Sequence, residues 1–194
     1  NLYKKNLKKL SKANAYYPSL EHDACGVGLV VSTEGKKSRK IVEFGIQALK
    51  AVWHRGAVDA DGKTGDGAGI HLEIPSDFFA EKIDLTGHKY DNSEICVGMV
   101  FLPRNNYEAQ ENCRTLIEKE LTKNNFSIYG WRQVPVNTKV LGEKANQTRP
   151  EIAQVLFKHL NKNLVGKELE RKLYESRRKI EKESSKIQLD NFYI

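Results

Sequence analysis

Residues 25–32 read Cys-Gly-Val-Gly-Leu-Val-Val-Ser, and the character of the chain changes at the first of them. Upstream, residues 1–24 are polar and contain five lysines against two acidic residues, a net charge of +3. Downstream, the valine-rich run predicts a buried β-strand over residues 27–32. The glycines on either side of Val27 allow a substrate or another backbone to come close to Cys25. The stretch therefore predicts a domain over residues 25–194, preceded by a leader at residues 1–24.

The rest of the chain alternates helical and strand patterns. Residues 95–102 are apolar throughout, which predicts a strand buried on both faces. Residues 152–160 are short and apolar and fit either a strand or a helix. We also expect three helices, at 42–53, from Asn105 or Asn106 to about 124, and at 165–186. Strands are expected at 70–74, within 127–136, and opening at 190–194. In the first helix we expect Ala48, Leu49, Val52 and Trp53 to face the core, with Gly56 as a C-cap. A chain that stops in a strand-like segment reads as a fragment.

The net charge of +7 is concentrated in two places. One is the leader, and the other is the predicted helix 167–186, where eight basic and five acidic residues give +3. Mixed signs at helical spacing indicate a solvated surface, so the charge map argues against a nucleic-acid-binding protein. No segment approaches the roughly 20 apolar residues of a membrane helix, and the leader lacks the apolar core of a signal peptide. We therefore expect a cytoplasmic protein that contacts neither nucleic acid nor membrane.

The three cysteines differ in their surroundings. Cys96 lies in an apolar strand and Cys113 on the apolar face of a helix, which is typical of inert core thiols. An odd number of cysteines argues against a disulfide framework, and no His/Cys cluster has the spacing of a metal site. Cys25, flanked by small residues, is the candidate nucleophile, although a plain strand-start cysteine fits the local pattern equally well.

A cysteine nucleophile needs a base or a lowered pKa. His22 and His54 are possible bases, but nothing in the sequence pairs either with Cys25. Cleavage between Ala24 and Cys25 offers another solution. The freed α-amine, which titrates near 8, would then lie within one residue of the sulfur and could take its proton.

Two further segments could support such a site. Arg55, followed by Gly56, is either an ordinary surface residue or a cation that folds back towards a thiolate or substrate charge. Residues 63–69 (Lys-Thr-Gly-Asp-Gly-Ala-Gly) contain a lysine and glycines but not in the order of a phosphate-binding loop. A tight turn in which Asp66 binds backbone N–H groups is the favoured interpretation, with a phosphate-binding nest as the alternative.

Taken together, these segments resemble the start of the glutamate synthase large subunit. The resemblance rests on residues 21–28 (Glu-His-Asp-Ala-Cys-Gly-Val-Gly), 54–57 (His-Arg-Gly-Ala) and 63–70, supported by 130–136 and 170–174. It implies a class II glutamine amidotransferase domain with an α+β fold, the four-layer αββα sandwich of N-terminal-nucleophile hydrolases, incomplete at the C-terminal end. It implies removal of the leader, nucleophilic attack by Cys25 on glutamine, and supporting roles for Arg55, Gly56 and Asp66.

The resemblance also implies what lies outside these residues. The family's Arg-Phe-Ser-Thr-Asn and His-Asn-Gly-Glu segments, which hold the glutamine carboxylate and the oxyanion, are absent from the sequence. We therefore expect negligible glutaminase activity from residues 25–194 alone, and no cofactor or metal within them. The parent enzyme is implied to use FMN and an iron–sulfur cluster, with further large-subunit domains and a small subunit or ferredoxin as electron donor. The alternatives are another class II amidotransferase, such as a purine or aminosugar enzyme, and a basic nucleic-acid-binding protein.

Overall fold

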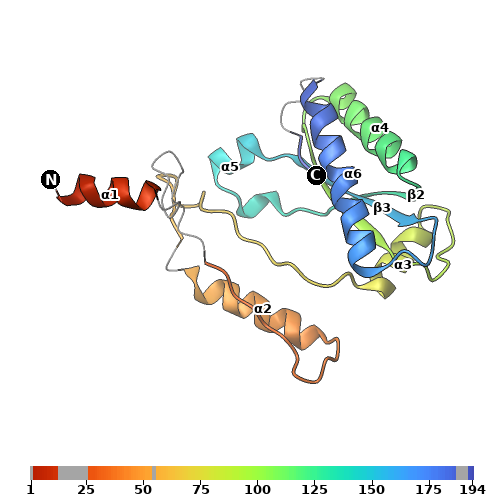
Figure 1. Ribbon diagram of the computed structural model, residues 1–194, viewed down its shortest axis with the longest axis horizontal. Helices are drawn as coiled ribbons and strands as arrows, with labels where there is room; N and C mark the ends of the chain where they lie inside the picture. The colour runs from red at the N-terminus through yellow and green to blue at the C-terminus, as the bar shows by residue number, and fades with distance from the viewer. Residues whose placement is uncertain (1, 13–25, 54–55, 187–191) are drawn as a thin grey trace. The chain divides into compact units, whose positions relative to one another are not determined.

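The computed structural model describes residues 2–12, 26–53, 56–186 and 192–194, in two units. The first unit comprises Asn1–Ala57 with Asp66–Ile70, and the second comprises Val58–Gly65 with His71–Ile194. The helices of the first unit are α1 (Leu2–Lys12) and α2 (Arg39–Ala51). Those of the second are α3 (Ser76–Asp84), α4 (Tyr107–Lys123), the 3₁₀ turn η2 (Thr138–Val140), α5 (Glu143–Thr148) and α6 (Gly166–Lys186), beside strands β1 (Cys96–Leu102), β2 (Phe126–Gln133) and β3 (Glu151–His159) (Figure 1).

The second unit is built on an antiparallel sheet of order β1-β3-β2. β3, the segment that fitted either strand or helix, is the central strand and pairs with both neighbours. Pairing on both sides satisfies its backbone groups, which explains why the apolar run folds as a strand. Gly130 lies just after a register shift in β2, at φ +147°, where an added Cβ would approach Thr86 Cγ2 to 2.9 Å.

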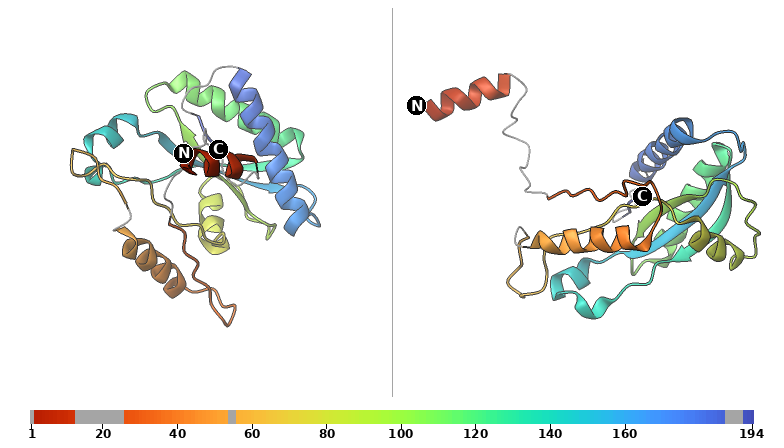
Figure 2. Two further views of the ribbon diagram at one scale, coloured as in Figure 1. Left: turned by 60° about the vertical axis from the view of Figure 1, so that its left-hand side comes forward. Right: turned by 90° about the horizontal axis from the view of Figure 1, so that it is seen from below.

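Each face of the sheet carries its own apolar cluster. One face packs against α4 and α6, which lie side by side over it, through buried residues such as Val100, Ile117, Val155 and Ile180 (Figures 1 and 2). On the other face, Phe79 and Ile83 of α3 pack against Tyr129 and Leu156. Alternation along each strand therefore divides the side chains between two clusters.

The helices predicted to about residue 124 and at 165–186, and the strands predicted at 95–102 and within 127–136, are confirmed with one correction, whereas the strand predicted at 70–74 does not form. Asn106 Oδ1 accepts from Ala109 N at 3.0 Å and begins α4 as predicted. Tyr193 forms a single bridge with Phe101, in the segment expected to open a strand. β1, however, is not buried on both faces, because Met99 is 42% exposed. The helices α4 and α6 cover one face, whereas α3 reaches only part of the other.

The first unit departs further from the predictions. Residues 27–32 do not form a strand, and Val27 and Leu29 are exposed; the run at 70–74, of which only Ile70 belongs to this unit, does not form one either. A valine-rich run becomes a strand only when another backbone pairs with it, and no described segment pairs with either run. α2 forms, but it has no buried residue and Trp53 is 74% exposed, so the core-facing prediction for this helix is wrong. Its C-cap is Val52, so Gly56 is not the predicted cap.

An ion cluster around Asp91 holds the loop before β1 against the sheet. Its carboxylate accepts from Lys158 Nζ at 2.7 Å, and Lys162 Nζ lies 2.9 Å away. The Tyr129 hydroxyl donates to the same carboxylate at 3.0 Å. Lys158 first, with Lys162 and Tyr129, holds the pKa of Asp91 well below its usual range, and the buried Tyr129 phenol has a raised pKa.

We expect Asp91→Asn to lower the free energy of unfolding by about 1–2 kcal/mol at pH 7, since it removes charge-assisted hydrogen bonds from a partly buried site. Because the pKa of Asp91 is lower in the folded than in the unfolded state, its contribution is present above about pH 4 and is lost as the pH falls below that value. Urea unfolding at pH 7 and pH 3 measures both effects. Glu43→Gln, which breaks an exposed pair with Arg39, is the control that should change little. If the difference in free energy of unfolding between wild type and Asp91→Asn were the same at pH 7 and pH 3, this account would be contradicted.

Candidate functional site

In the first unit, Asp66 of the glycine-rich loop forms two hydrogen bonds with Ala57. Its Oδ2 accepts from Ala57 N at 2.8 Å, and its own N–H donates to Ala57 O at 3.3 Å. Gly56 N donates to Trp53 O at 2.9 Å. The predicted hydrogen bond, in which the Asp66 carboxylate accepts from a backbone N–H, is therefore present, and it holds Ala57, the residue that follows Gly56.

In the second unit, residues 58–65 form a tight turn. Val58 and Gly65 form an antiparallel bridge, and Asp59 N donates to Thr64 O at 2.7 Å. Gly62 N donates to Asp59 O at 2.9 Å, with Gly62 at φ +68°, a conformation that favours glycine. A tight turn is therefore present, but it lies at residues 58–65 and not around Gly67 and Gly69, where an added Cβ would meet nothing within 4 Å.

Asp61 fills the centre of this turn. Its Oδ1 accepts from Lys63 N at 2.9 Å and Thr64 N at 2.7 Å, while its Oδ2 accepts from Thr64 Oγ1 at 2.5 Å. The Thr64 hydroxyl first, and then these two N–H groups, hold the pKa of Asp61 well below its usual range. The Lys63 and Thr64 N–H groups therefore bind a carboxylate of the turn itself and are not available to a phosphate.

The turn packs onto the start of α5. Thr64 Oγ1 accepts from Ala145 N at 3.5 Å, and Lys144 Nζ lies 2.7 Å from Asp59 Oδ2. Gly142, the N-cap of α5, is buried between them: a Cβ there would lie 2.1 Å from Thr64 Oγ1. Sequence reasoning missed this contact because about eighty residues separate its two sides. The Asp61–Thr64 pair alone carried a local signal, since aspartate binding backbone N–H groups two and three residues on is a common turn.

The remaining predicted site residues divide into two groups. Cys25, Arg55, His22 and His54 lie outside the described residues, so their predicted roles stay predictions. Cys96 and Cys113 are free, buried thiols, and burial raises their pKa to about 12 and about 11. Their burial confirms the assignment to the core, and thiols with a raised pKa are poor nucleophiles. Across the described ranges, we find no group of three His, Cys, Asp or Glu that could hold a metal ion. Nor is any described helix long and apolar enough to cross a membrane.

Comparison with known proteins identifies the class. The sequence signature of the glutamine amidotransferases class-II matches residues 25–194, so the chain belongs to that family. Within it, the chain is 52% identical over 99% of its length to the "Glutamate synthase [NADPH] large chain" of Azospirillum brasilense. It is 37% identical over 90% of its length to "Ferredoxin-dependent glutamate synthase 2" of Synechocystis sp., and 40% identical over 75% of its length to "Glutamate synthase [NADH]" of Saccharomyces cerevisiae.

The resemblance to the glutamate synthase large chain is therefore confirmed. The chain spans 13%, 11% and 7% of the length of these three relatives. What is established is thus a class II glutamine amidotransferase domain of the glutamate synthase type, whose described second unit is a mixed α/β body with one antiparallel sheet.

Proposed function

We propose that residues 25–194 are the nucleophile-bearing part of the glutaminase domain of a glutamate synthase large chain, with residues 1–24 as a removable leader. One observation carries the proposal: the family signature begins at Cys25, the residue at which the sequence itself changes character. A leader that ends at a cysteine masks the α-amine which that cysteine needs as a base.

The reaction then proceeds in two stages. The α-amine of Cys25 accepts the thiol proton, and the thiolate attacks the side-chain carbonyl carbon of glutamine. The resulting oxyanion is stabilised by hydrogen-bond donors, the C–N bond breaks, and ammonia leaves with the transferred proton. Water hydrolyses the thioester to glutamate and restores the thiol.

Three further residues, Arg55, Gly56 and Asp66, support the site through the segment that follows α2. In this proposal the Arg55 guanidinium attracts the thiolate or the substrate carboxylate. Asp66 is a positioning residue, and its two hydrogen bonds with Ala57 support this role. Gly56 gives the backbone the freedom to turn between Arg55 and Ala57.

The whole enzyme would use the released ammonia in a later domain. There, an imine formed from 2-oxoglutarate would be reduced to glutamate with FMN and an iron–sulfur cluster, in a cytoplasmic assembly. The three relatives are named for NADPH, ferredoxin and NADH, so this similarity leaves the electron donor open. The proposed architecture is the four-layer αββα sandwich, of which the sheet with α4 and α6 would supply one β layer and one α layer.

The test is the mature N-terminus of the large chain purified from its source. Intact mass and N-terminal sequencing are expected to find Cys25 as the first residue. A glutamine analogue with an electrophilic carbon should add to that residue once per chain. A chain that retains Ala24 and still hydrolyses glutamine would overturn the α-amine mechanism and point to His22 or His54 as the base.

A further inference from the structure

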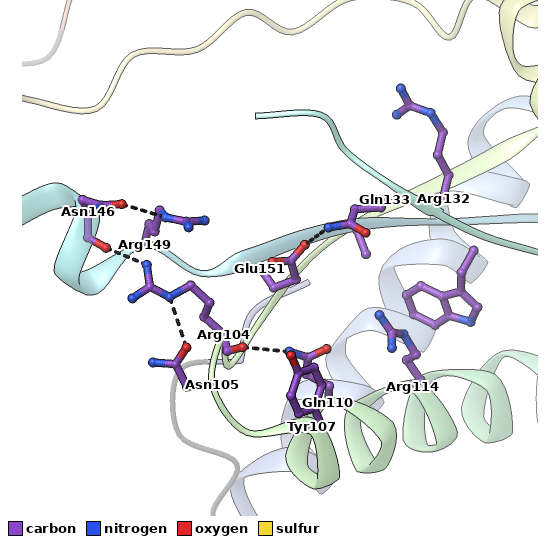
Figure 3. Close-up of a pocket in the computed structure, with 12 residues that line it drawn as sticks. Arg104, Asn105, Tyr107, Gln110, Arg114, Arg132, Gln133, Asn146, Arg149 and Glu151 are labelled. Atoms are coloured by element: carbon purple, nitrogen blue, oxygen red, sulfur yellow. Dashed lines mark hydrogen bonds between the residues drawn. The ribbon is translucent and has the colours of Figure 1, made fainter. Parts of the chain in front are cut away.

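The second unit contains a hollow away from the glycine-rich loop. It has a volume of about 820 Å³ and lies between the start of α4, the segment before β3 and the adjoining ends of β2 and β3 (Figure 3). Arg104 and Arg149 form one side of this arginine hollow, and Arg114 lies further along. Trp131 also lines the hollow. No step of the proposed glutaminase reaction uses these residues.

A single residue, Asn146, orients both arginines. Arg104 Nη1 donates to the backbone oxygen of Asn146 at 2.8 Å, and Arg149 Nε donates to its side-chain Oδ1 at 2.8 Å. Figure 3 shows the two guanidinium groups next to each other at this residue. Both side chains are partly buried, and holding them in place lowers the entropy that a ligand must overcome.

The charges of Arg104 and Arg149 are not paired with a carboxylate in the described part of the chain, although Glu151 also lines the hollow. Neither Arg104 nor Arg149 forms an ion pair there, and the terminal nitrogens of Arg149 have no hydrogen-bond partner among those residues. The nearby carboxylate of Glu151 is engaged by Gln133 Nε2. Because that hydrogen bond directs Glu151 towards Gln133 and not towards the arginines, the pre-oriented guanidinium groups keep N–H donors available to an external anion.

The other two arginines that line the hollow are placed differently. Arg114 is paired with Glu111 at 2.8 Å and lies over the Trp131 ring. Arg132 donates to Gln154 at 2.7 Å and points away from the hollow (Figure 3). Arg132 also lacks a carboxylate partner among the described residues, but its guanidinium points away, so Arg104 and Arg149 are the two unpaired arginines whose guanidinium groups lie together in the hollow.

We propose that Arg104 and Arg149 bind the phosphate or carboxylate group of a small molecule. Planar guanidinium forks match the paired oxygens of such groups, and the volume of the hollow lies in the range of small-ligand sites. Asn146 is the positioning residue, because its two oxygens hold both forks. The site is separate from glutamine hydrolysis and would bind its ligand whether or not Cys25 is exposed.

The experiment follows the arginine Nε–H and backbone amide NMR signals of the 194-residue chain during titration with inorganic phosphate and, separately, with malonate. Chloride at matched ionic strength is the reference. Saturable shifts of the Arg104 and Arg149 signals are expected. Tighter binding of phosphate or of malonate identifies which oxyanion the site prefers.

Arg104→Gln and Arg149→Gln should each weaken binding about tenfold or more, because each removes a charge-assisted contact. Asn146→Ala should weaken binding while keeping both charges, which a purely electrostatic surface effect would not do. Arg171→Gln removes the same charge from an exposed pair with Glu175 on α6 and should leave binding unchanged. Thermal unfolding in anion-free buffer checks that each variant is folded.

Shifts that grow linearly without saturation, that chloride reproduces, or that persist in Arg104→Gln and Arg149→Gln would overturn the proposal. So would an equal loss of binding in Arg171→Gln. Binding only by an acidic peptide, with none by phosphate or malonate, would replace it with a protein-contact surface.

Discussion

Cys25→Ala in the complete large chain is expected to lower the rate of glutamine hydrolysis by about 10³-fold or more, since no second nucleophile can take over the covalent step. Synthesis of glutamate from added ammonia should continue, because that reaction bypasses the thioester. The ratio of glutamine-dependent to ammonia-dependent activity is the measurement, since it is insensitive to differences in protein yield.

Two controls separate the chemistry from processing and folding. Cys25→Ala is made in two forms, one that includes residues 1–24 and one that starts at residue 25. Failed removal of the leader then cannot account for the loss of glutamine hydrolysis. Cys96→Ala removes a buried thiol whose pKa is raised to about 12 and should leave the activity ratio unchanged. Glutamine hydrolysis that survives Cys25→Ala would refute the nucleophile assignment.

The second unit was predictable because its elements carry strong local signals. α4 has a capping asparagine at one end and an apolar stripe that includes Cys113, Ile117 and Leu121, all of which are buried. α6 likewise buries Leu169 and Ile180. Helical periodicity and capping are properties of neighbouring residues, so they can be read without knowing what packs against them.

The first unit was less predictable because its elements depend on partners distant in sequence. The apolar run at 27–32 has strand composition, yet Val27 and Leu29 are exposed and unpaired in the described residues. α2 has the helical pattern but buries none of its residues. Amino-acid composition indicates that a segment can form a strand, but the strand forms only when another strand pairs with it.

The candidate site shows the same division. The role of Asp66 in binding a backbone N–H was predictable from a turn of a few residues, and the hydrogen bond to Ala57 confirms it. Gly142, Lys144 and the arginine hollow were missed, because they join segments tens of residues apart and no periodic pattern connects them. The functional roles of Cys25 and Arg55 rest on the family resemblance and on the experiments above.

Gly142→Ala is expected to detach the turn at residues 58–65 from α5. The added Cβ would lie 2.1 Å from Thr64 Oγ1, 2.4 Å from Asp61 Oδ2 and 2.5 Å from Thr64 N. Such an overlap in a packed contact costs about 1–3 kcal/mol, which corresponds to roughly 5- to 150-fold faster hydrogen exchange of the Lys63 and Thr64 amides. These two amides report directly on the turn, because both donate to Asp61.

The faster exchange in Gly142→Ala would come from the steric overlap of the added Cβ and not from backbone strain at residue 142. Gly142 has φ −70° and ψ 165°, which alanine adopts without strain. Gly69→Ala is the matched control, because an added Cβ there meets nothing within 4 Å, and the exchange rates should not change. Adding Thr64→Ala to Gly142→Ala removes the hydroxyl but leaves Thr64 N at 2.5 Å, so it should not restore protection. Full recovery of protection in that double variant would show that the side chain alone sets the contact, and would contradict the close backbone packing described here.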